Sequence, residues 1–228
     1  MSEQGFTYVM GGIYGYKRRF EDVMQQINLK RADRLYILGD ALGESMDGLA
    51  LLVELMQIPN VKLLLGLQEV TIRRHISSLM RYGEVKVEAV RSEKPLYQNL
   101  FQLSQRMQKQ VLNFINRSAI NVDVRVGDTE YLLVYGAPME ACPYEGEDQE
   151  REREFFALAE TLPPDWEPMD HRVVVSNGAP TEVYQDGEPA RIWYGNQQIA
   201  INCAMDHPSQ GRLCCLRLDD GKVFYSQN

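Results

Sequence analysis

The sequence lacks the features that place a protein in a membrane or on a polyanion. It contains no run of about 18 apolar residues, which argues against a transmembrane helix. Its 24 Lys and Arg residues are outnumbered by 32 Asp and Glu residues, for a net charge of −8. Nucleic acids and anionic membranes would repel such a chain, so we expect neither as a partner. Residues 1–5 also lack the basic and apolar regions of a secretory signal, and we expect a cytoplasmic protein.

Cysteine is too sparse and too irregularly spaced to define a disulfide framework or a zinc site. The four cysteines are Cys142, Cys203, Cys214 and Cys215. None forms a Cys-x-x-Cys pair, and the two adjacent ones lie in a predicted strand, where their side chains point to opposite faces. We therefore expect reduced thiols in or near the hydrophobic core.

The first third of the chain repeats a pattern in which a buried strand ends at glycine. Strands are predicted at 6–10, 34–38 and 61–65, and each runs into a glycine-bearing turn. Apolar residues recur at helical spacing between them, at 17–29 and 46–57. The resulting β-α-β-α-β order predicts a parallel sheet whose loops form a site at the carboxyl ends of the strands.

The second half has the shorter period of β-strands. Further strands are predicted at 121–126, 130–135, 171–176, 191–194, 198–203, 212–218 and 222–226. The charged segment 145–154 is interpreted as a solvated loop that enters a surface helix, with a partner-docking loop as the alternative. Together these patterns predict an α/β fold in which a two-sheet β-sandwich is flanked by helices. We expect a parallel N-terminal half, an antiparallel C-terminal half, and a single domain over 1–228.

The glycine-bearing turns resemble the signature segments of the calcineurin-like metallophosphoesterases, most closely the bacterial branch of the serine/threonine protein phosphatases. That family carries Asp-x-His-Gly, Gly-Asp-x-x-Asp-Arg-Gly and Gly-Asn-His-Glu after its first three strands, and two histidine-containing segments later. In the same order this chain has Gly12-Ile13-Tyr14-Gly15, Gly39-Asp40-Ala41-Leu42-Gly43-Glu44-Ser45, Gly66-Leu67-Gln68-Glu69, Val134-Tyr135-Gly136-Ala137 and Asn177-Gly178-Ala179-Pro180-Thr181. The resemblance implies the metallophosphoesterase sandwich. It also places predicted helical sequence at about 84–118 where such phosphatases carry a variable cap.

The resemblance further identifies the positions at which the family holds metal, phosphate and a catalytic histidine. The family's functional residues correspond in turn to Gly12, Tyr14, Asp40, Gly43, Glu44, Leu67, Gln68, Tyr135 and Gly178. Of these, Gly12, Tyr14, Asp40, Leu67, Tyr135 and Gly178 stand where metal ligands stand. Gly43 stands at the second-segment aspartate, Glu44 at the phosphate-binding arginine and Gln68 at the catalytic histidine. Only Asp40 keeps the family's chemistry.

One carboxylate is too little for a two-metal hydrolase. Such an enzyme needs several oxygen and imidazole ligands to hold two cations and to make hydroxide at neutral pH. Glu44 in place of an arginine would repel a phosphate instead of binding it. We therefore expect no catalytic residues and no metal cofactor. The sequence favours an inactive homologue, a pseudophosphatase, that binds an unidentified protein or small molecule.

An active phosphoesterase with an atypical metal site is the alternative. His207, beside Asp206 in a predicted loop, is the histidine best placed to join Asp40 as a ligand. A site of this kind would hold Mn, Fe or Zn. His75 and His171 are interpreted as surface or structural residues.

Tyr14 and Tyr135 are expected to face each other across the position of the family's metals. Their rings either fill that volume as part of the core or line an aromatic pocket for a small molecule or a peptide side chain. The sequence leaves both interpretations open.

Overall fold

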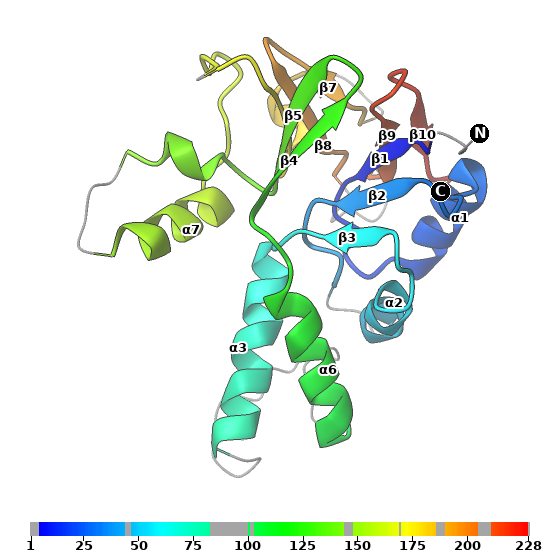
Figure 1. Ribbon diagram of the computed structural model, residues 1–228, viewed down its shortest axis with the longest axis vertical. Coiled ribbons are helices and arrows are strands. Elements are labelled where there is room, and N and C mark those ends of the chain that lie inside the picture. The colour runs from blue at the N-terminus through cyan, green and yellow to red at the C-terminus, as the bar shows by residue number, and fades with distance from the viewer. Residues whose placement is uncertain are drawn as a thin grey trace.

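Two mixed sheets pack face to face in the computed structural model, with helices around them (Figure 1). The structure describes residues 5–43, 47–82, 100, 103–143, 148–168, 170–185, 190–204 and 211–227. The first sheet has the strand order β10-β9-β1-β2-β3. Its strands are β1 (Thr7–Met10), β2 (Arg34–Ile37), β3 (Val61–Leu63), β9 (Cys214–Arg217) and β10 (Val223–Tyr225).

The second sheet has the order β4-β5-β6-β8-β7. Its strands are β4 (Asn121–Val126), β5 (Thr129–Val134), β6 (Val173–Pro180), β7 (Trp193–Tyr194) and β8 (Gln198–Asn202). The α-helices are α1 (Lys17–Ile27), α2 (Asp47–Leu55), α3 (Leu67–Tyr82), α6 (Gln105–Asn116) and α7 (Gln149–Ala159). Two short 3₁₀ helices are η2 (Met139–Ala141) and η3 (Thr181–Val183).

β1 shows how the sequence builds core on both faces of the first sheet. Successive side chains of a strand point to opposite faces. Tyr8 and Met10 pack with Phe20 of α1, whereas Val9 packs with Ile201 of the second sheet. All of these side chains are buried. The uninterrupted apolar sequence of β1 therefore reflects a central strand covered by a helix on one side and by a sheet on the other.

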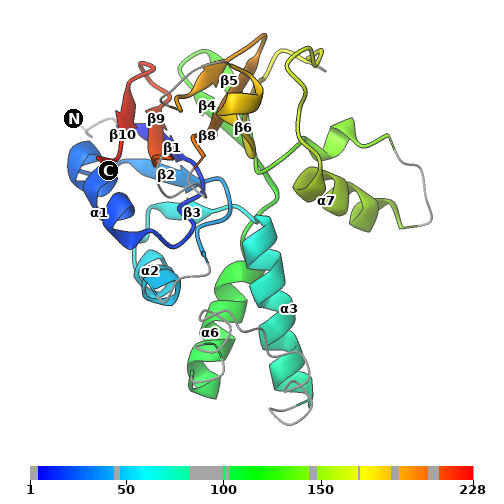
Figure 2. The ribbon, with the colours of Figure 1, turned by 180° about the vertical axis from the view of Figure 1, so that it is seen from behind.

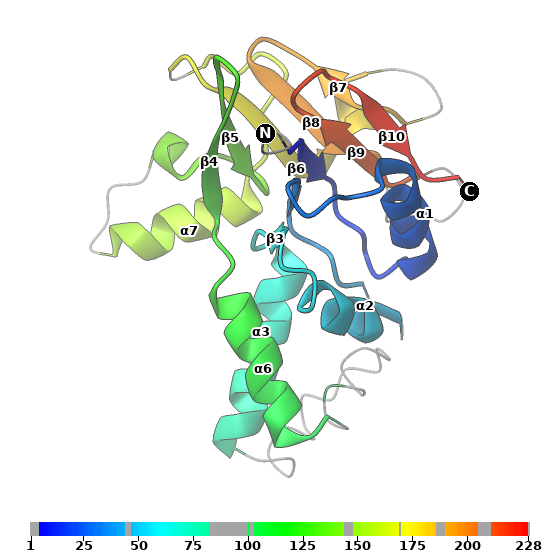
Figure 3. The same ribbon diagram turned by 45° about the vertical axis from the view of Figure 1, so that its right-hand side comes forward.

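The predicted α/β two-sheet fold is confirmed. β1, β2 and β3 run parallel, with α1 and α2 as the crossover helices, and β9 and β10 join the other edge antiparallel (Figure 3). Because the three parallel strands share one direction, the loops that follow them open at the same rim of the sheet.

The antiparallel prediction for the second half is only partly right. β4–β5 and β7–β8 are antiparallel, but β5–β6 and β6–β8 are parallel. Parallel neighbours need a crossover connection, and α7 lies in the connection between β5 and β6. The charged sequence at 145–154 gives no sign of this crossover helix, because the buried side chains Ala157 and Leu158 come only at the end of α7.

α3 and α6 form a helical pair that extends away from the two sheets (Figure 2). They share an apolar cluster that includes Ile72 and Ile76 of α3 and Val111 and Ile115 of α6. Of the predicted helical sequence at about 84–118, the part from Gln105 is present as α6. Residues 83–99 and 101–102, which include much of the expected insert at about 84–118, lie outside the described residues.

The described part of the chain contains no helix that combines the length and apolar character needed to cross a membrane.

Candidate functional site

The loops after β1, β2 and β3 meet around Asp40. The backbone carbonyl of Asp40 accepts N–H bonds from Ile13 at 3.0 Å and from Tyr14 at 2.8 Å. The N–H of Gln68, at the start of α3, donates to the Asp40 side chain. The glycine-ended strands therefore bring three of the predicted segments together, as the parallel topology requires.

Asp40 is buried, and protein donors occupy both of its carboxylate oxygens. Oδ1 accepts the backbone N–H of Gln68 at 3.0 Å, and Oδ2 accepts the Tyr135 hydroxyl at 2.7 Å. The Asp40 backbone has a φ of 47°, a left-handed conformation that Asp tolerates better than most residues. A buried carboxylate needs such donors, because an unpaired charge in the interior is costly.

Tyr135 is held as a neutral donor. Burial raises the pKa of its phenol far above the ordinary value, and the nearby Asp40 carboxylate raises it further. The hydroxyl therefore keeps its proton at physiological pH and donates a hydrogen bond to Asp40. A protonated phenol is a poor ligand for a cation, so Tyr135 acts here as a hydrogen-bond donor.

Glu69 is a buried acid that reasoning from metal ligands alone misses. Its side chain is fully buried, and Oε2 accepts the N–H groups of Asp40 at 2.8 Å and Gly66 at 3.0 Å. Oε1 accepts those of Ala41 at 3.0 Å and Leu42 at 3.4 Å. One carboxylate thus ties the loop after β2 to the start of α3. The available signal was the acid of the segment Gly66-Leu67-Gln68-Glu69, which matches the last residue of Gly-Asn-His-Glu.

The charge state of Glu69 depends on opposing effects. Burial is the largest influence, and together with the neighbouring Asp40 charge it raises the pKa of Glu69 to about 8. Backbone N–H donors act in the other direction by favouring the ionised form. Two negative charges in one buried cluster repel each other, so the ionisation of Glu69 depends on the charge of Asp40.

Asn177 is a second residue that the search for ligands does not single out. Its side chain is fully buried on β6, and Oδ1 accepts the N–H of Gly12 at 2.9 Å. Its own N–H donates to the carbonyl of Tyr135 at 2.8 Å. Among the described residues, its Nδ2 has no hydrogen-bond partner. Asn177 therefore joins the β1 loop to the second sheet beside Asp40 and leaves one buried donor unused.

Three glycines of the predicted site, Gly12, Gly43 and Gly178, are enclosed by their neighbours. A Cβ at Gly12 would lie 2.7 Å from Cε2 of Tyr14 and 3.2 Å from Cβ of Asp40. A Cβ at Gly43 would overlap the backbone carbonyl of Tyr14, and one at Gly178 would lie 2.9 Å from Cγ2 of Thr161. The Tyr14 ring thus lies against Gly12, and the surrounding atoms leave little room for a side chain at any of these three glycines.

The outer part of the rim is partly exposed. The Leu67 side chain is 48% exposed at the start of α3, and Tyr14 and Gln68 are half-buried. Tyr135 is buried beneath them and contributes its hydroxyl to the polar centre. Glu44, Asp206 and His207 lie outside the described residues.

The described residues do not fit a two-metal centre. No group of three or more His, Cys, Asp or Glu side chains converges in the part of the chain that the structure describes. Asp40 has both carboxylate oxygens engaged, one by Tyr135 and the other by Gln68. The described residues therefore provide no set of ligands through which two bound metals could act.

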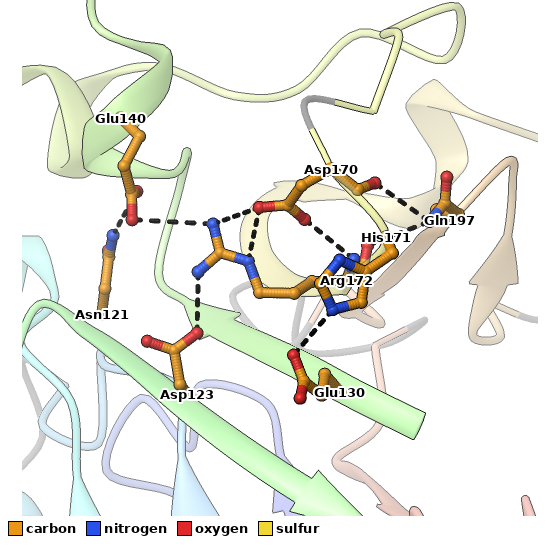
Figure 4. A network of polar contacts seen from close by, with 8 residues as sticks. All are labelled: Asn121, Asp123, Glu130, Glu140, Asp170, His171, Arg172 and Gln197. Atoms are coloured by element: carbon orange, nitrogen blue, oxygen red, sulfur yellow. Dashed lines mark hydrogen bonds and ion pairs between the residues drawn. The ribbon is translucent and has the colours of Figure 1, made fainter. Parts of the chain in front are cut away.

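A separate polar network surrounds Arg172 just before β6 (Figure 4). Its guanidinium lies 2.7 Å from both Asp123 and Asp170 and 3.7 Å from Glu140. His171 contacts Glu130 at 2.8 Å. These ion pairs link β4, η2 and the start of β6, and none of their members belongs to the Asp40 cluster.

Comparison with known proteins identifies the fold of the chain. No protein-family profile and no curated protein matches the sequence. Among solved structures, a provisionally assigned diadenosine tetraphosphatase matches with a TM-score of 0.62 and 15% identity, over 100% of this chain and 96% of that one. A metallophosphoesterase from Sphaerobacter thermophilus matches with a TM-score of 0.54 and 14% identity, over 97% and 87%.

The chain has the metallophosphoesterase fold. A serine/threonine phosphatase from Saccharomyces cerevisiae also matches, with a TM-score of 0.51 and 11% identity over 99% of this chain and 80% of that one. At such low identities the likeness establishes the fold alone, because one fold supports many functions. Function has to be argued from the residues around Asp40.

Proposed function

We propose that this protein is a catalytically inactive metallophosphoesterase homologue, a pseudophosphatase, that acts as a binding or regulatory module. The observation that carries the proposal is the hydrogen bond between Tyr135 and Asp40. A bridging carboxylate must direct its oxygens at cations to support hydrolysis. Here the same oxygens accept protein hydrogens, and breaking those bonds would leave a buried tyrosine hydroxyl and a backbone N–H without partners.

The enclosed glycines support the proposal independently. Placing a side chain at Gly12 or Gly43 requires the Tyr14 loop to move, because the ring and the carbonyl of Tyr14 occupy the adjoining space. The loss of chemistry is therefore accompanied by packing that favours the metal-free arrangement. The partly exposed residues Tyr14, Leu67 and Gln68 offer a mixed apolar and polar surface to a protein segment or a small molecule.

The resemblance to the bacterial branch and the acidic composition support a place in the bacterial cytoplasm as a single domain. This setting is part of the proposal, and it is checked by fractionating the native host and probing for the chain.

The test combines metal stoichiometry with phosphoesterase activity on the purified protein. After exposure to Mn, Fe and Zn salts and removal of the excess, elemental analysis is expected to find substoichiometric metal. A generic phosphomonoester is expected to turn over no faster with the wild type than with Asp40→Asn. Two bound metal equivalents, together with activity that Asp40→Asn abolishes, would contradict the proposal. If Asp206→Ala and His207→Ala also abolished that activity, the atypical metal site would be established.

A further inference from the structure

The amino ends of β1 and β2 form a cavity at the other end of the sheet from Asp40. β1 begins at Thr7 and β2 at Arg34, and the loops that reach Asp40 leave the opposite ends of these strands. The cavity has a volume of about 240 Å³. The β4–β5 hairpin of the second sheet and Asp219 after β9 complete its wall. Segments from both sheets therefore converge on this space.

Hydrogen bonds fix the backbone that frames the cavity. The N–H of Phe6 donates to Asp33 at 2.8 Å, and the N–H of Thr7 donates to Asp219 at 2.7 Å. The N–H of Arg34 donates to the carbonyl of Phe6 at 2.8 Å. A Cβ at Gly5 would overlap the carbonyl of Ala32, so the two strands approach closely at this point. The wall is preorganised, which lowers the entropy that a bound ligand would cost.

Two arginines line the cavity without acidic partners. Arg34 and Arg125 are both exposed, and no carboxylate within the described ranges forms an ion pair with either. The Arg125 side chain donates to the carbonyl of Gly127 at 3.4 Å. Arg172, by contrast, is surrounded by three carboxylates (Figure 4). On a chain with a net charge of −8, two cations at one cavity form a local site of opposite sign.

We propose that this cavity binds a small oxyanion, the phosphate or carboxylate group of a small metabolite. Guanidinium groups present paired N–H donors that match the oxygens of both anions. The volume lies below the range of about 300–1,000 Å³ that is usual for drug-sized ligands, so the ligand is compact. Asp219 is the one acid that lines the cavity among the described residues, and its carboxylate limits the affinity for anions. The site is independent of the function proposed for the Asp40 cluster.

Calorimetric titration with inorganic phosphate and, separately, with succinate tests this site. We expect saturable binding of at least one probe at one site per chain. Arg34→Gln and Arg125→Gln should each weaken that binding by about tenfold, because each removes charged hydrogen-bond donors. Arg74→Gln is the control, since it removes the same charge from an exposed position on α3 outside the cavity.

Asp219→Asn provides a test of opposite sign. The Asn amide oxygen can still accept the N–H of Thr7, while the negative charge beside the anion is gone. We expect tighter binding of the same probe. Binding of phosphate alone would assign the site to phosphorylated metabolites, and binding of succinate alone would assign it to carboxylates. Absence of saturable binding to both probes, or equal binding by the folded Arg34 and Arg125 variants, would overturn the proposal.

Discussion

The bond between Tyr135 and Asp40 connects the two sheets through a buried acid. Tyr135 follows β5 of the second sheet, and Asp40 follows β2 of the first. A hydrogen bond to a buried charge contributes more than one between neutral groups, since the unpaired charge would be strongly disfavoured. The Tyr135 side chain therefore stabilises this fold.

Tyr135→Phe is expected to lower the free energy of unfolding by about 1–3 kcal/mol, because Asp40 loses a donor while the ring remains. Tyr184→Phe is the matched control. Its hydroxyl donates to the neutral carbonyl of Leu162 at 2.8 Å, so the cost should be about 0.5–1.5 kcal/mol. Urea unfolding measures both variants. A Tyr135→Phe cost no larger than the control would remove the special role of this bond.

Glu69 predicts a stability that falls as the pH rises. Its folded pKa, about 8, lies above the ordinary value of 4.5, so the folded state keeps the proton longer than the unfolded state. Its contribution is complete below pH 4.5 and is lost as the pH rises through 8. The slope can reach about 1.4 kcal/mol per pH unit.

Glu69→Gln removes the titrating group. We expect this variant to be less stable overall, because an amide NH₂ would face backbone N–H donors. Its unfolding free energy should nevertheless depend less on pH between about 5 and 8 than that of the wild type. Unfolding at a series of pH values measures the slope. Equal slopes in the two proteins would show that Glu69 does not hold its proton in the folded state.

At the scale of loops and strands, glycines in turns differ in how closely their neighbours pack against them. In the loop after β1, the carbonyl of Tyr14 lies against Gly43. By contrast, a Cβ added at the hairpin glycine Gly127 would have no neighbouring atom within 4 Å. Both are glycines in turns, but only Gly43 is enclosed. The difference allows the effect of a close approach to be separated from the general preference of turns for glycine.

Gly43→Ala is expected to destabilise the protein by more than about 3 kcal/mol, because the two loops must separate. Gly127→Ala should cost only about 1 kcal/mol, which arises from its φ of 59° and not from a clash. Thermal unfolding of the two variants gives the comparison. Similar costs would show that the loop after β1 adjusts freely around Gly43.

The sequence predicts the strand and helix pattern well and the polar centre only in part. The glycine-ended strands identify the rim at Asp40, because strand direction and turn chemistry are local properties. Apart from the local bond between Glu69 and Gly66, the bonds that the Glu69 and Asn177 side chains make depend on residues 27 to 165 positions away, which no local pattern encodes. The sequence also does not predict the parallel pairing of β5 and β6. The helix between them, α7, has many charged residues and only a short apolar face, so its crossover role is not recognisable from the sequence.

On the scale of the whole molecule, one apolar cluster joins the two sheets. Val9 and Leu38 of the first sheet and its loops share this cluster with Val175 and Ile201 of the second. All four side chains are fully buried. Neither sheet can bury its inner face without the other, so the two should unfold together.

Tryptophan fluorescence and far-ultraviolet circular dichroism should report the same urea midpoint. The two tryptophans, Trp166 and Trp193, lie in the second half, while α1 and α2 cover the first sheet. Leu38→Ala should lower both midpoints equally, at a cost of about 2–5 kcal/mol. A fluorescence transition that precedes the loss of helical signal would indicate that the sheets are separate folding units.

A crystal structure of the protein soaked in manganese chloride tests the central claim most directly. Anomalous scattering would locate any bound manganese, and the refined coordinates would show where the Tyr135 hydroxyl lies. We predict that the hydroxyl stays within hydrogen-bond distance of Asp40, as in the present 2.7 Å contact, with no anomalous peak beside the carboxylate. Manganese coordinated by Asp40, with Tyr135 turned away, would contradict the account.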